Sequence, residues 1–282
     1  MLRKPSPSYQ WTGQPLSVGE LRHESTMART DIPAAILPLI VCTERAVSAY
    51  IQALRFVVHD TARDPEFSRT HLFAYLVEDL FQSAIAIPLL AAEGMWGVAR
   101  RELRFILESS TKQAVIQHEA YTTSIQDKLS QFDRLLSSAS ISCKNRLSLN
   151  LLEEDLQPQF LEEVGRLYGE GSSYVHLSMR QIQDRMYSLE KGYRLGFEGE
   201  EEAKAATDLV ARTLAASIVL LLHGVPSYVA GDLLVESDGT SRDWFFAQSR
   251  FIASMDAKFD YKHERNGVID DVLSKRQSIV SF

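Results

Sequence analysis

The segment IPAAILPLIVCTERAVSAYIQALRFVVH, residues 32–59, carries the pattern that decides the fold. Its apolar residues recur at intervals of three and four: Ile36, Ile40, Val47, Ile51 and Leu54. This is the spacing of one face of an α-helix. Asp31 is placed to cap the start of the helix, and Pro33 fits its first turn. The pattern predicts a long first helix with one buried face.

Similar spacing along the rest of the chain predicts further helices over 67–92, 98–121, 124–137, 158–190, 200–223, 227–234, 242–259 and 268–275. We expect the second to bend or break at Pro88, and residues 158–190 to form one long helix or two nearly collinear ones. Residues 137–148 are rich in serine and are expected to form a mobile loop. Because strand-like alternation is nearly absent, the predicted fold is an all-α multi-helix bundle.

The chain divides into an extended N-terminal arm, residues 1–30, and a single helical domain, residues 31–282. The arm contains prolines and glycines and lacks the apolar stretch of a signal peptide. The longest stretch without Asp, Glu, Lys or Arg covers residues 213–231. Its apolar part is shorter than the roughly 20 residues that span a bilayer, so it is predicted to be a buried core helix. No membrane association is expected.

Composition and charge exclude several classes of protein. The 282 residues are 45% hydrophobic, which suffices for a sizeable core, and the net charge of −7 provides no global positive field for nucleic acid or anionic lipid. Any contact with nucleic acid must therefore be local. The two cysteines, Cys42 and Cys143, cannot build a disulfide framework or a cysteine-based zinc site. We expect a cytoplasmic protein without cofactor or metal.

The first polar feature is the segment ARRELRFILE, residues 99–108. On a helical wheel, Arg104 and Glu108 lie one turn apart between two apolar faces. Such a pair either locks neighbouring helices as an ion pair or holds an anionic ligand. Arginine before glutamate is the less favourable order for an exposed pair on one helix, which favours a tertiary role.

The second polar feature is the segment RLYGEGSSYVHLS, residues 166–178. Tyr168, Ser172 and His176 recur every four residues, so in a helix they would form a polar ridge. The pKa of a free histidine lies near neutrality, which makes His176 a candidate general acid or base, or a donor to phosphate. The alternative is a half-buried histidine satisfied by Ser172 or by a carbonyl. His59 and His223 are expected at helix ends, where an imidazolium complements the helix dipole.

Together the patterns A-R-x-x-L-R-x-x-x-E and Y-x-x-x-S-x-x-V-H-x-S resemble the HEPN-like helical domains of a branch of bacterial proteins, over residues 97–186. The resemblance implies a HEPN-like core over 97–223 and a C-terminal helical extension over 225–282. It also implies a homodimer that targets RNA or a nucleotide in a toxin–antitoxin or antiphage system, as a metal-independent ribonuclease, with an antitoxin or another protein as partner. Other members of this class serve in binding or assembly without catalysis.

The chain departs from the Arg-x4-6-His motif of the catalytic members. Arg166 precedes His176 by ten residues, which is about 15 Å along a continuous helix, and no other Arg–His pair fits the spacing. The arginine of an active site would have to come from another helix, with Arg104 as the first candidate and Arg100 or Arg101 behind it.

The site implied in this way has His176, Arg104 and Glu108 as catalytic residues. His176 would act as acid or base, Arg104 would stabilise charge on the phosphorus, and Glu108 would orient Arg104. Tyr168 and Ser172, with the two further arginines, would bind the substrate. The alternative function, a noncatalytic helical module for protein–protein interaction, is favoured by the acidic charge and by the missing motif.

Overall fold

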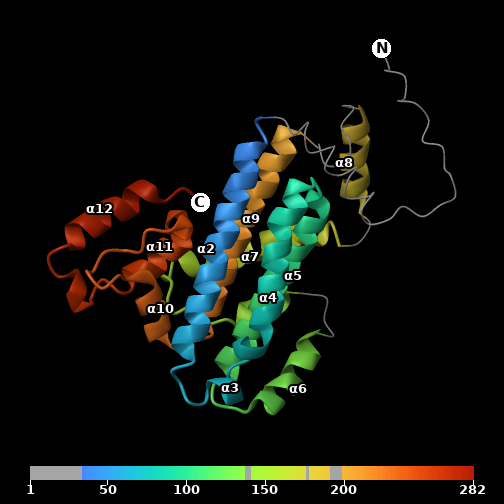
Figure 1. The fold of residues 1–282 in the computed structure, drawn as a ribbon. Coiled ribbons are helices and arrows are strands. Elements are labelled where there is room, and N and C mark those ends of the chain that lie inside the picture. The colour runs from blue at the N-terminus through green and yellow to red at the C-terminus, as the bar shows by residue number, and fades with distance from the viewer. Residues whose placement is uncertain (1–33, 137–140, 176–177, 191–198) are drawn as a thin grey trace.

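The computed structural model describes residues 34–136, 141–175, 178–190 and 199–282 (Figure 1). Within these residues the protein is an all-α multi-helix bundle, as the sequence predicts. The expected N-terminal arm, residues 1–30, lies outside the described residues.

Four long helices form the centre of the molecule: α2 (Leu37–Thr61), α4 (Phe73–Ala92), α5 (Trp96–Glu119) and α9 (Glu200–His223). Both α2 and α5 pack against α4 and α9, so the four helices enclose one core. A second apolar cluster joins the beginnings of α2, α5 and α9 to the end of α4. Therefore α4 runs antiparallel to the other three helices.

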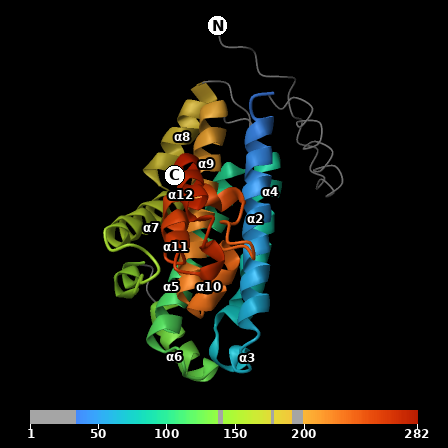
Figure 2. The ribbon, with the colours of Figure 1, turned by 90° about the vertical axis from the view of Figure 1, so that its left-hand side faces the viewer.

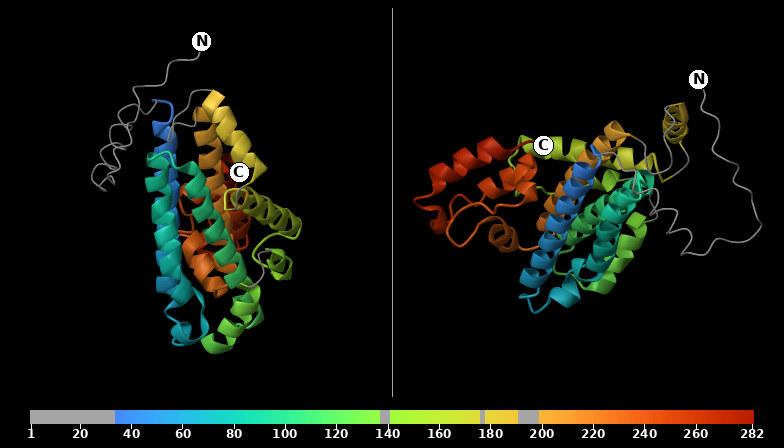
Figure 3. Two further views of the ribbon diagram at one scale, coloured as in Figure 1. Left: turned by 90° about the vertical axis from the view of Figure 1, so that its right-hand side faces the viewer. Right: turned by 45° about the horizontal axis from the view of Figure 1, so that its top comes forward.

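Shorter helices surround this bundle: α3 (Phe67–Thr70), α6 (Ile125–Leu136), the 3-10 helix η1 (Ser142–Arg146), α7 (Leu156–Ser172), α8 (Met179–Glu190), α10 (Ser227–Leu234), η2 (Phe245–Gln248), α11 (Arg250–Ala257), η3 (His263–Arg265) and α12 (Ile269–Ile279). Figure 2 shows α7 lying across the long helices. The helices α10, α11 and α12 gather on one side of the bundle and α8 on the opposite side (Figures 1 and 3).

By length and composition, α4 and α9 are the two helices in the described part of the chain that could cross a membrane. The apolar window of α9 is 83% buried within the protein, whereas that of α4 is only 22% buried. The burial of α9 confirms that the charge-free stretch predicted as a core helix lies in the core. The exposed face of α4 was not expected from the sequence.

Buried hydroxyl groups connect three of the long helices. The Tyr50 hydroxyl on α2 lies 2.8 Å from Ser217 Oγ on α9, which lies 2.6 Å from Ser110 Oγ on α5. Burial raises the pKa of Tyr50 well above its ordinary value. Because buried hydroxyls are costly without partners, this chain of hydroxyl groups fixes how α5 sits against α2 and α9.

The helix predicted over 67–92 is broken earlier than expected. It divides into α3 and α4 at His71, whose backbone is extended and whose buried ring packs edge-on against Tyr121, at 5.2 Å between ring centroids. Pro88, the expected site of a break, lies inside α4, which continues through it.

Two further segments differ from the prediction. The segment predicted as one long helix or two nearly collinear ones forms α7, which ends at Ser172, and α8, which begins at Met179. The two helices point in different directions (Figure 2). Residues 242–259 form η2 and α11 with Ser249 between them.

The described part of the expected mobile loop, residues 141–148, contains a short helix and buried side chains. These residues contain η1 and bury Ile141 and Cys143. Lys144 crosses α7 beside Gly165 and donates a hydrogen bond to the carbonyl of Leu161 at 2.5 Å. Lys144 thus satisfies a carbonyl of the neighbouring helix, whereas Ser142, Asn145, Arg146 and Ser148 are exposed.

Candidate functional site

The candidate site lies where α7 crosses α5, because both polar sequence features meet there. Gly171 on α7 makes the close crossing possible: a Cβ atom at this position would lie 2.8 Å from Arg104 Cβ and 3.3 Å from the Arg100 carbonyl oxygen. Any larger residue would push the helices apart. The glycine of the second motif therefore brings α7 onto the arginine-rich face of α5.

Arg104 is held from both helices. Its Nε donates to Ser172 Oγ at 3.0 Å, and its Nη2 donates to the Tyr168 hydroxyl at 2.7 Å. Its Nη1 forms an ion pair with Glu108 Oε2 at 3.1 Å, and the guanidinium carbon lies 4.8 Å from the centre of the Tyr168 ring. Three side chains thus fix the plane of one guanidinium group.

Arg104 keeps some capacity for a further ligand. An arginine has five N–H groups, and three are used by these partners, so two have no partner among the described residues. The Arg104 side chain as a whole is 16% exposed. A fixed fork of N–H groups of this kind is suited to a phosphate oxygen pair.

Glu108 connects this arginine to a second cation. Its Oε1 accepts a hydrogen bond of 2.6 Å from Lys112 Nζ, one turn further along α5. The Lys112 side chain is almost completely buried. Glu108 is therefore shared by two cations, and the group of three side chains carries a net positive charge.

The other two arginines of α5 hold the segment that follows α7. Arg100 is buried, pairs with Glu202 on α9, and lies over the Tyr174 ring at 4.5 Å. Arg101 is exposed, and its Nε donates to the Tyr174 carbonyl at 2.6 Å. Of these two expected substrate-binding residues, Arg101 is exposed, whereas Arg100 is buried and joins α5 to α9.

Tyr174 ties the same segment to α8. Its hydroxyl donates to Asp184 Oδ2 at 2.8 Å, and burial raises its pKa to about 12. The phenol therefore stays protonated at neutral pH and acts as a donor.

The structure thus brings together Arg104, Glu108, Tyr168 and Ser172, four of the residues singled out from the sequence. His176 lies outside the described residues, two positions after Tyr174. The expected ridge along one helix is interrupted, since α7 ends at Ser172. Within the described residues, no three histidine, cysteine, aspartate or glutamate side chains are grouped so that they could hold a metal ion.

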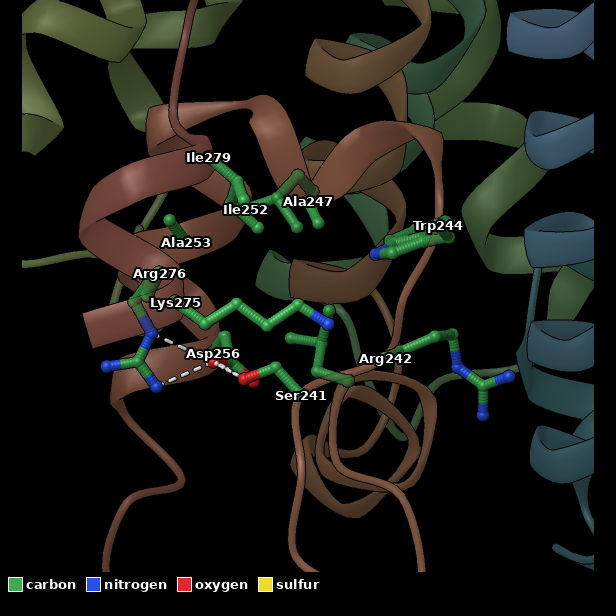
Figure 4. A pocket seen from close by; sticks show the side chains of 11 residues that line it. Ser241, Arg242, Trp244, Ala247, Ile252, Ala253, Asp256, Lys275, Arg276 and Ile279 are labelled. Carbon is green, nitrogen blue, oxygen red and sulfur yellow. Dashed lines mark hydrogen bonds and ion pairs between the residues drawn. The ribbon is translucent and has the colours of Figure 1, made fainter. Parts of the chain in front are cut away.

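A second charged cluster, in the C-terminal helices, was not predicted from the sequence. Asp256 on α11 accepts hydrogen bonds from Ser241 at 2.6 Å and from Arg276 at 2.6 Å (Figure 4). Arg265 donates to the other carboxylate oxygen of Asp256 at 2.5 Å. Arg265 is buried. One sequence feature could have revealed this cluster: Asp256 is a charged residue within the otherwise uncharged, largely apolar segment FIASMDA, residues 251–257.

The hollow beside this cluster is too small for a substrate. It is bounded by Trp244, Ala247, Ile252 and Ile279 on its apolar side (Figure 4). Its volume is about 20 Å³, enough for one water molecule, whereas sites for small ligands are larger by an order of magnitude. The cluster holds α11, η3 and α12 together.

Comparison with known proteins finds no matching family model, no matching curated protein and no matching solved structure. The interpretation of the site therefore rests on its own geometry and on the two sequence motifs.

Proposed function

We propose that the protein is a HEPN-like helical effector directed at RNA or a nucleotide, with its site at the crossing of α5 and α7. One observation supports this proposal above the others: Arg104, Tyr168 and Ser172 come from the two separate motifs, and they contact one another directly. The contacts join residues 64 and 68 positions apart in the chain. The chain reaches His176 four residues after Ser172.

The chemistry of such a site needs no metal. Arg104, oriented by Glu108, binds a phosphate and stabilises the charge that develops on its oxygens. His176 takes the proton from a ribose 2′-hydroxyl as that oxygen attacks phosphorus, or gives a proton to the leaving 5′-oxygen. The products of the cleavage are a cyclic 2′,3′-phosphate and a free 5′-hydroxyl. Tyr168 and Ser172 hold the arginine and the edge of the substrate.

The test is to express the wild type and His176→Ala in bacteria and to compare growth and the integrity of bulk RNA. We expect the wild type to slow growth and degrade RNA, and the variant to do neither. His263→Ala is the matched control, because the side chain of His263 is 87% exposed and remote in sequence from the site. Identical behaviour of wild type and His176→Ala, with both folded, would contradict the proposal.

A second variant tests the role of the arginine. Arg104→Lys keeps the charge but cannot reach Ser172, Tyr168 and Glu108 together, because an ammonium lacks the planar fork. We expect RNA cleavage to fall by about 10²-fold or more with the helical content unchanged. Full activity in Arg104→Lys would remove this residue from the site.

The alternative function, a noncatalytic helical interaction module, has its own support. Three partners already engage Arg104, as expected of a group that only locks helices. Several large apolar side chains of α8 are also exposed: Met179, Ile182, Met186 and Tyr187. A wild type that cleaves no RNA, and behaves in this respect like both variants, would favour this module. Both candidate functions include the proposal that the protein is cytoplasmic and binds a protein partner.

A further inference from the structure

A hollow between α7, α9 and α11 has the size of a binding site for a small molecule. Both α7 and α11 pack against α9, and Figure 2 shows the three helices together. The volume of the hollow is about 570 Å³, within the range of about 300–1,000 Å³ that is usual for sites of small ligands. It shares no lining residue with the contacts around Arg104 or with the cluster around Asp256.

Small and aromatic side chains form the apolar part of this hollow. Helix α9 contributes Ala215 and Ala216, whose small size leaves the space open, and α11 contributes Phe251. A further wall includes Phe282, whose backbone N–H donates to the Gln248 carbonyl at 3.2 Å. These side chains offer an apolar surface that an apolar part of a ligand would cover.

Two of the four charged side chains that line the hollow, Glu163 and Arg212, already bind each other. The carboxylate of Glu163 lies 2.6 and 2.7 Å from Arg212 Nη2. Arg166 donates to both oxygens of the same carboxylate at 3.0 Å. Because Glu163 is buried between these two arginines, the group joins α7 to α9 and its carboxylate is fully used.

The other two charged side chains, Asp208 on α9 and Arg250 on α11, have unused capacity. Oδ2 of Asp208 lies 3.4 Å from Arg212 Nη1, its other oxygen has no partner among the described residues, and the side chain is 57% exposed. Arg250 is exposed, and its guanidinium carbon lies 4.7 Å from the centre of the Phe251 ring. An arginine has five N–H donors, and no side chain of the described residues accepts from those of Arg250. One available charge of each sign therefore faces the hollow, each from a different helix.

We propose that this hollow binds a short apolar peptide with free ends, of the size of a dipeptide, with its ammonium group at Asp208 and its carboxylate at Arg250. The charged side chains of the lining, two positive and two negative, sum to zero. A ligand with one charge of each sign fits this balance, whereas an anion or a cation alone leaves one charge of the hollow without a partner. The guanidinium of arginine can bind a carboxylate through two parallel hydrogen bonds. The inference does not depend on the site between α5 and α7.

The length of a dipeptide matches the separation of the two helices. The axes of packed helices lie about 8–10 Å apart, and two extended residues span about 7 Å. The two ends of a dipeptide can therefore reach both walls, and its apolar side chains then lie against Ala215, Ala216 and Phe251. A single amino acid carries its two charges closer together than this.

The test is isothermal titration calorimetry of the full chain with the dipeptide phenylalanyl-leucine. We expect the wild type to bind it, and acetylation of its amino end or amidation of its carboxyl end each to weaken binding about tenfold, because each removes one charged partner. Asp208→Asn should bind the free and the acetylated dipeptide equally. Arg250→Gln should bind the free and the amidated dipeptide equally.

Asp243→Asn and Arg69→Gln are the matched controls, since these side chains are 87% and 77% exposed, do not line the hollow and undergo the same charge changes. Both should bind the free dipeptide like the wild type. A wild type that binds no dipeptide would overturn the proposal, as would Asp208→Asn and Arg250→Gln variants that bind like the wild type. Equal affinity of the wild type for the free and the acetylated dipeptide would overturn it too and assign the hollow to an organic anion instead.

Discussion

The helices α4 and α9 are alike in apolar character but have opposite surroundings. Each is long and apolar enough to cross a membrane, yet the apolar window of α9 is 83% buried and that of α4 only 22% buried. The difference arises from their neighbours, because α2, α5, α7, α10 and α11 all pack on α9, whereas α2 and α5 are the main neighbours of α4. Apolar composition thus predicts a helix, but position in the bundle decides whether its surface is buried or exposed.

The largest expected difference is in the free energy of unfolding, between a leucine-to-alanine substitution on α9 and one on α4. Leu220 on α9 is fully buried, so Leu220→Ala should lower the free energy of unfolding by about 2–5 kcal/mol. Leu89→Ala on α4 should change it by about 0.5 kcal/mol or less, because that side chain is already mostly in water. Urea unfolding should be measured at protein concentrations low enough to exclude dimers. Equal losses in the two variants would show that α4 is covered in solution.

The second prediction concerns His223 at the end of α9. Its Nδ1 donates to the Val219 carbonyl and its Nε2 accepts from the Leu151 N–H at 3.2 Å. Burial lowers its pKa to about 4, so the ring is neutral at pH 7, and the expected charged cap was wrong.

Because the unfolded chain binds a proton at this histidine below about pH 6.5 and the folded protein does not until about pH 4, acid favours unfolding. The stabilisation is fully present above pH 6.5. We expect the wild type to lose about 3 kcal/mol more than His223→Gln between pH 7 and pH 4, since glutamine supplies one donor and one acceptor without titrating. Parallel stability–pH curves for the two proteins would contradict the neutral, buried assignment.

Helix α7 also has one glycine packed against a neighbouring helix, Gly171, and one that is open, Gly169. Substituting them should change the free energy of unfolding by less than the substitutions above. Gly171 touches α5, so Gly171→Ala should destabilise by about 1–3 kcal/mol and shift α7 away from Arg104. A methyl group at Gly169 would meet no atom within 4 Å, and Gly169→Ala should stabilise by about 0.5–1 kcal/mol. Thermal unfolding of both variants gives the comparison. A stabilised Gly171→Ala would show that the two helices are not in close contact.

The sequence predicted the helices well where periodicity and end signals agree. The helix at α9 begins with three glutamates and ends before Gly224, and both boundaries were found. The break at His71 was missed because it depends on where the ring packs, and not on a local signal. Likewise, the polarity of residues 141–148 suggested a loop, although Lys144 uses its polar end to satisfy a carbonyl of another helix.

The candidate site was predicted in its components but not in its geometry. Spacing placed Arg104 beside Glu108 and Ser172 beside Tyr168, because these pairs lie one turn apart on single helices. Contacts between the helices depend on how α7 crosses α5, which Gly171 permits but no periodicity encodes. The buried role of Arg100 also follows from Glu202, a residue of another helix.

The central claim is that Arg104, fixed by Tyr168, Ser172 and Glu108, forms one wall of a site that His176 completes. The direct measurement is an experimental structure with inorganic phosphate present, giving the distance from the Arg104 guanidinium to the nearer ring nitrogen of His176. The account predicts about 8 Å or less, the span of one phosphate with a charge-assisted hydrogen bond on each side. A longer distance, or an imidazole turned away from α5, would contradict it.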